Sequence, residues 1–182
     1  MAIANPQEKL VHELCLAYDA EHQFVEGQQE MAREATDQDL ESAVREHIEQ
    51  TRLHIRNLEE VFHHLDRRPQ RQTSVVAQGL VSEAQKDIQE AQNEAIRDCL
   101  VDAAVIKVEH FEMGSYRGMV TGAQQMGQTE IADLLSENLR QEEATARIAE
   151  QSAPELLQKA MQAGEQDEGG LVDKAKEKLT GQ

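Results

Sequence analysis

Acidic and imidazole side chains stand in mid-helix, at positions where the surrounding pattern calls for apolar residues. Glu21 interrupts one apolar stripe in the stretch YDAEHQF, and Glu109 interrupts another in the stretch VEHFE. Four stripes are interrupted in this way, each near the middle of its helix. The interrupting residues are Glu21, His47, Gln50, His54, Glu109, Glu112 and Glu142, with Glu143 as an alternative to Glu142.

A metal ion would make such a cluster of acids tolerable. An isolated ionised carboxylate in a dry core costs several kcal/mol or more. Several carboxylates at one level of an antiparallel bundle therefore need cations between them. Mixed carboxylate and imidazole ligands suit iron, manganese or zinc, whereas calcium and magnesium prefer oxygen alone. The residues alone leave these three metals open, bound as one ion or as a pair.

Each of these residues also has an ordinary structural explanation. A single glutamate such as Glu21 is more often solvated on a helix surface, and His47 or His54 could be a histidine at the edge of the core. Glu112 could pair with an arginine on the outer face. The metal hypothesis therefore depends on the acids of four helices meeting at one level, and not on any single position.

Apolar periodicity predicts the helices that would carry these residues. Steps of three and four between apolar positions are typical of helices with one buried face. Asn5 and Pro6 form a helix start, Pro69 ends the second helix, and Gly127 with Thr129 marks a turn. The predicted helices cover about 6–35, 37–67, 74–91 and 93–126, and a last one runs from 129 to beyond 148.

The order of these segments predicts an all-α protein. Two long helical hairpins are joined by a crossover that holds a short extra helix, which is the topology of a ferritin-like antiparallel four-helix bundle. We expect the bundle to occupy residues 1–163, with Pro154 kinking or stopping its last helix. Residues 164–182 are polar and rich in glycine, which predicts a mobile tail. Gly114, Gly118 and Gly122 share one helix face, which favours close helix packing and a homodimer.

Composition narrows the possible partners and location. The net charge is −17, so the chain would repel nucleic acid and anionic membranes. The sequence contains no secretion signal, no CxxC motif and no apolar run of about 18 residues. Cys15 and Cys99 both fall in apolar patterns, which predicts reduced, buried thiols. Together these features predict a soluble cytoplasmic protein.

Four stretches resemble the YciE/YciF family of ferritin-like bacterial stress proteins, over about residues 8–152. They are YDAEHQ, EHIEQTRLHIRNLEEVF, GLVSEAQ and KVEHFEMGSYRG, of which the last is the most specific. The resemblance implies an antiparallel helical bundle, homodimers, expression under stress, and a metal site similar to that of rubrerythrin-type proteins.

The resemblance also implies roles for single residues. Glu21 matches the glutamate of the first helix, Glu109 and Glu112 match a Glu-x-x-Glu pair, and Glu142 or Glu143 matches the glutamate of the last helix. Gln50 stands where the family usually has glutamate. Neither the second nor the last helix has a clean Glu-x-x-His pair. On the last helix, Thr145 and Ala146 occupy the places where histidine would fall.

Two functions follow as hypotheses. The first is a stress protein that binds iron or manganese inside the bundle, with oxygen or peroxide chemistry, and with Tyr18 and Tyr116 shielding or hydrogen-bonding the site. The second is a structural or protective protein that has lost its metal and acts through partners. The repeated core acids favour the first, and the missing histidines favour the second.

Overall fold

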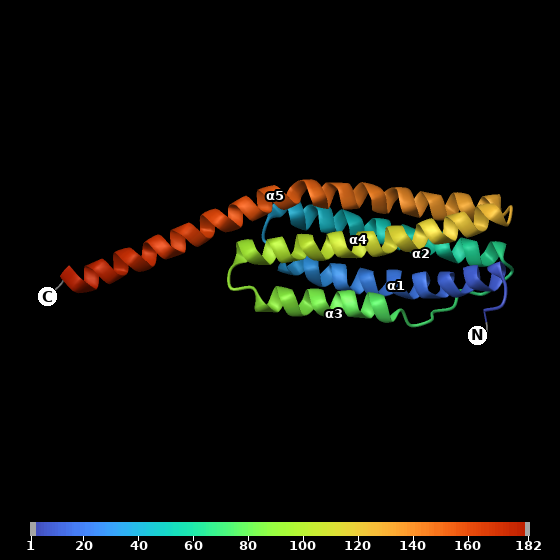
Figure 1. The fold of residues 1–182 in the computed structure, drawn as a ribbon, viewed down its shortest axis with the longest axis horizontal. Helices are drawn as coiled ribbons and strands as arrows, with labels where there is room; N and C mark the ends of the chain where they lie inside the picture. Colours follow the sequence, from blue (N-terminus) through green and yellow to red (C-terminus); the bar gives the residue numbers. More distant parts are fainter. Residues whose placement is uncertain (1–2, 181–182) are drawn as a thin grey trace.

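Four long helices lie side by side in an elongated bundle, and a shorter helix lies along its outside (Figure 1). The computed structural model describes the backbone of residues 3–180 and the side chains of residues 3–164. The helices are α1 (Pro6–Glu34), α2 (Gln38–His64), α3 (Val75–Glu90), α4 (Glu94–Gln125) and α5 (Thr129–Thr180). In the bundle α1 packs on α2 and α4, and α5 packs on α4 and α2, while α3 packs on α1 and α4. The predicted four-helix bundle with a crossover helix is confirmed.

Capping side chains determine where several of the helices begin. The Asn5 side chain accepts a hydrogen bond from the Glu8 backbone, and Asn93 caps α4 in the same way. Asp37 caps α2, which begins one residue later than the start of the predicted segment. Each cap satisfies a backbone N–H group that the first turn of a helix leaves without a partner. Gly127, with φ of 71°, makes the turn between α4 and α5 in the left-handed region that favours glycine.

The loop between α1 and α2 is held by a side chain from the second hairpin. Asp98 on α4 accepts hydrogen bonds from the Thr36 backbone N–H and hydroxyl, both at 2.7 Å, and from the Asp37 backbone N–H at 3.0 Å. Asp98 is itself buried. The two hairpins are therefore fixed to each other at this end of the bundle.

Two apolar clusters lie on either side of a polar level. The first contains Leu14, Leu58 and Leu135, and the second contains Met31 and Val101. On α1, Glu21 stands between Leu14 of the first cluster and Met31 of the second. Apolar side chains therefore pack against the polar level from both ends of the bundle.

Close packing on α3 depends on one glycine. A Cβ atom at Gly27 of α1 would lie 3.2 Å from a methyl group of Val81 on α3, which is closer than ordinary van der Waals contact. The missing side chain therefore allows α3 to approach α1. Val81 packs with Phe24, Ala77 and Val108 in a third, smaller apolar cluster.

Two predictions about helix shape and packing were not met in full. Of the two outcomes expected at Pro154, a stop is wrong, because α5 continues beyond it to Thr180, and Figure 1 shows α5 changing direction partway along its length. The glycine face of α4 does not receive another helix of this chain, since an added Cβ at Gly114, Gly118 or Gly122 would have no atom within 4 Å. The side chains of the predicted tail lie outside the described residues from position 165 onward, so its mobility stays a prediction.

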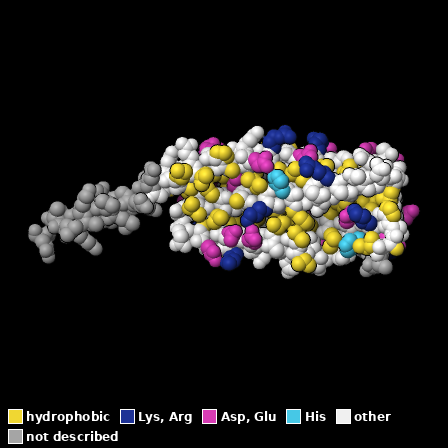
Figure 2. Space-filling model, in the orientation of Figure 1, with side chains coloured by type: hydrophobic (Ala, Val, Ile, Leu, Met, Phe, Trp, Pro, Cys, Tyr) yellow, Lys and Arg dark blue, Asp and Glu magenta, His cyan; other side chains and the backbone are white. Residues whose placement is uncertain are grey.

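Charged side chains of both signs are scattered over the face of the bundle shown in Figure 2, among apolar ones. In the described part of the chain, no helix combines the length and apolar character needed to cross a membrane. Both cysteines are free thiols. Cys15 is buried as expected, whereas Cys99 is only half-buried.

Candidate metal centre

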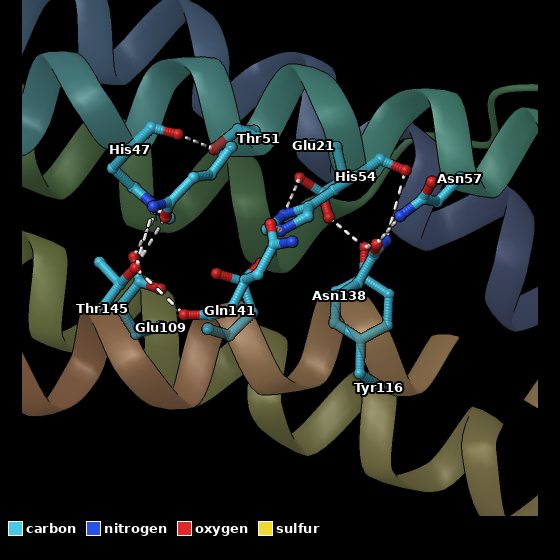
Figure 3. Close-up of polar contacts among 12 residues, drawn as sticks. Glu21, His47, Thr51, His54, Asn57, Glu109, Tyr116, Asn138, Gln141 and Thr145 are labelled. Carbon is cyan, nitrogen blue, oxygen red and sulfur yellow. Dashed lines mark hydrogen bonds and ion pairs between the residues drawn. The ribbon is translucent and has the colours of Figure 1, made fainter. Parts of the chain in front are cut away.

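Six of the seven candidate ligands meet inside the bundle. Each has at most 3% of its surface exposed. They are Glu21 from α1, His47 and His54 from α2, Glu109 and Glu112 from α4, and Glu142 from α5. Figure 3 shows this level of the bundle, with side chains from the four helices pointing toward one another.

Helical spacing places these side chains on inward faces. His47 and His54 are seven residues apart on α2, which is close to two full turns. Glu109, Glu112 and Tyr116 on α4 are spaced by three and then four residues, so they follow one face for two turns. Each helix therefore delivers its polar groups to the same level without any break in its backbone.

Ligand atoms from different helices approach closely. His47 Nε2 lies 2.9 Å from Glu109 Oε1 (Figure 3). His54 Nδ1 lies 2.9 Å from Glu142 Oε1. His54 Nδ1 is also 3.7 Å from Glu21 Oε2. These contacts join α2 to the three other helices of the bundle.

The candidate ligands form two groups that share one residue. His47, Glu109, Glu112 and Glu142 offer atoms within 4.8 Å of one another, and Glu21, His54 and Glu142 do the same. Glu142 belongs to both groups, so it would be a ligand shared by two ions. The first group has three carboxylates and one imidazole, and the second has two carboxylates and one imidazole.

Many atoms of this centre have no hydrogen-bond partner. Among the described side chains, ten buried nitrogen or oxygen atoms lack one, and eight of the ten belong to the six candidate ligands. They include both carboxylate oxygens of Glu109 and of Glu142, and the inward nitrogens of His47 and His54, which bond the nearby glutamate oxygens only when a proton lies between them. Buried polar atoms are almost always satisfied in folded proteins. Cations bound between them would satisfy these atoms, so the residues present fit a metal centre.

In the metal-free centre, the pKa values of three buried carboxyl groups are raised. Burial raises the pKa of Glu109 and of Glu142 from 4.5 to about 8. Burial, together with the charges of Glu142 and Glu21, raises the pKa of Glu112 well above its usual range. Each of these carboxyl groups therefore holds a proton more tightly in the folded chain than in water.

The pKa values of the two histidines are shifted in opposite directions. Burial lowers the pKa of His47, because the charged imidazolium is poorly solvated there. Burial also acts to lower the pKa of His54, but the neighbouring Glu21 and Glu142 outweigh it and raise that pKa to about 11. In the metal-free protein, the His54 imidazolium therefore supplies one positive charge between two carboxylates.

The ligand set has the size of a dimetal centre but an unusual distribution. Carboxylate-bridged dimetal bundles use four glutamates and two histidines, arranged as one Glu on each of two helices and a Glu-x-x-His pair on each of the other two. This chain also brings together four glutamates and two histidines. Here α2 provides both histidines and α4 provides two glutamates, while Thr51 and Thr145 occupy the remaining places of the two Glu-x-x-His pairs.

Gln50 lies at the edge of the centre and not within it. Its Oε1 atom is 3.3 Å from the outer nitrogen of His47, Nδ1, and 3.2 Å from the Thr145 hydroxyl. Thr145 contacts the same nitrogen at 3.3 Å. Gln50 and Thr145 thus hold the ring of His47 so that Nε2 faces Glu109. Outer contacts of this kind orient metal-binding histidines.

Sequence reasoning missed two outer residues on α5. Gln141 Oε1 lies 3.0 Å from His54 Nε2, and Asn138 Nδ2 donates to the Tyr116 hydroxyl at 3.0 Å (Figure 3). Asn138 is fully buried and stands four residues before Glu142. A polar residue one turn from a candidate ligand, on the same face, is the signal that could have identified it.

The structure decides between alternatives that the sequence left open. Glu142 points into the bundle, whereas Glu143 lies outside and pairs with Arg117 at 2.7 Å. The Tyr116 hydroxyl donates to Glu21 Oε1 in the centre. Tyr18, which was also expected near the site, instead donates to Glu59 at 2.8 Å.

Proteins of known sequence and structure resemble this chain over most of its length. Residues 5–162 match the family described as a domain of unknown function, DUF892. Protein YciF of Escherichia coli K12 is 32% identical over 146 residues, which are 80% of this chain and 88% of that protein. The crystal structure of the E. coli stress protein YciF has a TM-score of 0.82 and 30% identity, and covers 86% of this chain and 99% of that one.

Two further solved structures share the fold. YcfI from Rhodopseudomonas palustris has a TM-score of 0.80 and 28% identity, over 81% of this chain and 94% of that one. A protein from Xanthomonas campestris has a TM-score of 0.71 at 19% identity, over 88% of this chain and 99% of that one, and shows the fold alone. The chain therefore belongs to the DUF892 family, the YciE/YciF family of ferritin-like stress proteins that its sequence predicted.

Proposed function

We propose that this protein binds a pair of iron or manganese ions inside the bundle and uses them to reduce peroxide or dioxygen. One observation carries the proposal. Eight buried nitrogen and oxygen atoms of four glutamates and two histidines converge at one level without hydrogen-bond partners. The mixture of carboxylate and imidazole suits these two metals.

Charge balance favours two ions over one. Glu21, Glu109, Glu112 and Glu142 would carry four negative charges when ionised, and two divalent cations would neutralise them with both histidines uncharged. A single divalent ion would leave an excess of negative charge in a buried site, which is costly. The two groups of ligand atoms, with Glu142 shared, offer a place for each ion.

The residues of the chain would hold, orient and shield the ions. His47 would bind through Nε2 and His54 through Nδ1, because Thr145 and Gln141 contact their other nitrogens. The apolar clusters on both sides would keep bulk water out. When bound, two divalent ions would each give up one electron, and with two protons these electrons would convert peroxide to two water molecules, after which an external electron donor would return the ions to the divalent state.

We extend the proposal to the setting in which the protein acts. A relative from E. coli is described as a stress protein, and peroxide reduction is a protective chemistry that suits such a role. We propose a cytoplasmic homodimer that does not bind nucleic acid. The net charge of −17 supports the last point, and the unpartnered glycine face of α4 supports a dimer.

Metal analysis tests the proposal directly. Protein produced in medium supplied with iron or manganese should contain about two ions per chain, and anomalous scattering should place them at this level. Glu142→Gln removes the shared carboxylate and should lower the metal content of both positions. Glu143→Gln is the matched control, because Glu143 pairs with Arg117 outside the bundle.

The rival hypothesis predicts a different result from the same experiment. A structural or protective protein that acts through partners would contain no iron or manganese and would gain no stability when either is added. Its buried acids would then be balanced by protons and by the His54 imidazolium alone. That outcome would exclude the metal-dependent function and leave the rival.

A further inference from the structure

Tyr116 divides the two oxygens of Glu21 between different tasks. The Tyr116 side chain is fully buried, and its hydroxyl donates to Glu21 Oε1. Glu21 Oε2 has no hydrogen-bond partner and lies 3.7 Å from His54 Nδ1, inside the candidate metal centre (Figure 3). One carboxylate oxygen is thus engaged by the chain itself, and the other faces the place of an ion.

Other side chains fix the Tyr116 hydroxyl in place. Asn138 Nδ2 donates to it at 3.0 Å and also contacts the backbone oxygen of His54 at 3.3 Å. Asn57 Nδ2 in turn donates to Asn138 Oδ1 at 2.7 Å. The hydroxyl accepts one hydrogen bond and donates another, so its proton is directed at Glu21 Oε1.

The two ends of the centre are unequal in protein ligands. The His47 end has one imidazole and three carboxylates, and both oxygens of Glu109 face it without partners. The other end has only His54 Nδ1, Glu21 Oε2 and the shared Glu142. Iron and manganese commonly take six ligands, and a three-ligand face leaves positions open to other molecules. Even with Glu112 as a second shared ligand, this end would remain short of six.

We propose that Tyr116 is a positioning residue that limits Glu21 to one metal-facing oxygen, and so keeps a coordination position open at the Glu21–His54 end for a small anion or oxidant. This inference depends on the proposed metal function. Beyond that function, the inference identifies the end of the centre that accepts the external molecule and the residue that keeps this end open. Without the hydroxyl, both oxygens of Glu21 would be free to bind the same ion.

Azide is the probe for the open position. Iron-loaded wild-type protein should bind azide, with a change in its absorption spectrum that saturates as azide is added. Tyr116→Phe keeps the aromatic ring and removes only the hydroxyl, so it should retain its metal but bind azide about 10- to 100-fold more weakly, the usual size of an outer-contact effect. Tyr18→Phe is the matched control, because the Tyr18 hydroxyl contacts Glu59 and not the centre.

A measurement on the metal-free protein tests the hydrogen bond on its own. In protein with ¹³C-labelled glutamate side chains, Tyr116→Phe should shift the carboxyl resonance that Glu21→Gln removes, and Tyr18→Phe should leave it unchanged. An unchanged resonance in Tyr116→Phe would show that the hydroxyl does not hold Glu21, and would overturn the inference.

The outcomes separate this inference from the proposed function. If wild type and Tyr116→Phe both bind metal, and both bind azide equally well, the inference fails and the metal function stands. If the wild-type protein takes up no metal, the proposed function fails, and the open position fails with it. If Tyr116→Phe retains its metal but binds azide more weakly, and Tyr18→Phe does not, the result supports both the metal function and the inference.

Discussion

His47 and Glu109 belong to different helical hairpins, yet His47 Nε2 lies 2.9 Å from Glu109 Oε1. His47 comes from α2 and Glu109 from α4, which are joined only through the crossover and α3 along the chain. Neither atom has a hydrogen-bond partner, although both are buried. A cation bound between these two atoms would satisfy both and would connect the two halves of the fold.

Replacing Glu109 should separate the stability of the metal-free protein from its metal binding. Glu109→Gln removes a buried acid whose carboxylate oxygens have no hydrogen-bond partner. We therefore expect the free energy of unfolding of the metal-free protein to rise by about 1–3 kcal/mol near pH 8, so that the variant unfolds at a higher urea concentration. The same change should weaken metal binding at least about tenfold, as loss of a coordinating carboxylate does. Urea unfolding with and without manganese measures both effects.

The surface glutamate Glu143 provides the control for this substitution. Glu143→Gln loses only an exposed pair with Arg117, so its unfolding free energy should change by less than about 1 kcal/mol. Equal effects of Glu109→Gln and Glu143→Gln on metal-dependent stability would contradict the assignment of Glu109 to the centre.

The metal-free protein should lose stability as pH rises. The pKa values of Glu109 and Glu142 are raised from 4.5 to about 8, so between these values the folded chain keeps protons that the unfolded chain has released. The pKa of His54 is raised from 6.5 to about 11, so its contribution is complete below pH 6.5 and is lost toward pH 11. Both effects lower the free energy of unfolding as pH rises, by about 1.4 kcal/mol per pH unit for each group. The lowered pKa of His47 acts in the opposite direction below pH 6.5, but it is one group against three.

Metal should reverse this dependence. Metal ligands must lose their protons, so the stabilisation by manganese should grow as pH rises from about 5 to 8. Urea unfolding across this range, with manganese and with a chelator, measures the two slopes. Stability of the chelated protein that rises with pH over the same range would be inconsistent with buried, protonated acids at this level.

The sequence predicted the helices well because their signals are local. Asn5, Asp37 and Asn93 each cap a helix by bonding a backbone group within three residues, and the apolar periodicity extends over many turns. Helix α5 continues past Pro154 for a physical reason. A proline removes one backbone hydrogen bond, but apolar contacts of residues beyond it, such as Leu156, continue to hold the helix on the bundle.

The sequence predicted which acidic residues form the candidate site, but not which histidine contacts which glutamate. Glu21, Glu109 and Glu142 interrupt apolar stripes, and that signal is visible along each helix. Which histidine faces which glutamate depends on the rotation and depth of neighbouring helices, which no single helix encodes. His47 at the Glu109 end, with Thr145 behind it, therefore emerged only from the packed structure.

Asp98 should be the residue on which the α1–α2 loop depends. Asp98→Ala removes three hydrogen bonds to Thr36 and Asp37 and leaves their backbone N–H groups without that partner. We expect a loss of about 2–4 kcal/mol in unfolding free energy, since hydrogen bonds to a charged group are worth about 1.5–3 kcal/mol each and are not additive. Exposed Asp133 on α5 offers the matched substitution, Asp133→Ala, which should have little effect.

The metal centre should tolerate the Asp98 substitution. Asp98 lies near the start of α4, three turns of helix before Glu109, and it contacts the loop and not the candidate ligands. Metal content per folded chain should therefore equal that of the wild type in Asp98→Ala. A variant that loses its metal while remaining folded would show that the loop and the centre are coupled.

The glycine face of α4 should form the proposed homodimer contact. Gly114 and Gly118 are exposed, and a Cβ at either position would meet no atom of this chain within 4 Å. Gly118→Leu should therefore leave the protomer folded, and even favour the helix by up to about 1 kcal/mol, because glycine is a poor helix former. In a dimer that uses this face, the new side chain would separate the two backbones.

Sedimentation equilibrium measures this effect. Wild-type protein should sediment as a dimer, and Gly118→Leu should shift it toward the monomer, with a dissociation constant raised by at least about tenfold for a loss of 1.4 kcal/mol. Gln124→Leu, at an exposed position of α4 about 120° around the helix from Gly118, controls for added apolar surface. If Gly118→Leu and Gln124→Leu sediment alike as dimers, the glycine face does not form the contact between copies. Metal content that stays the same in the monomer would further show that each chain completes its own centre, since all six candidate ligands come from one chain.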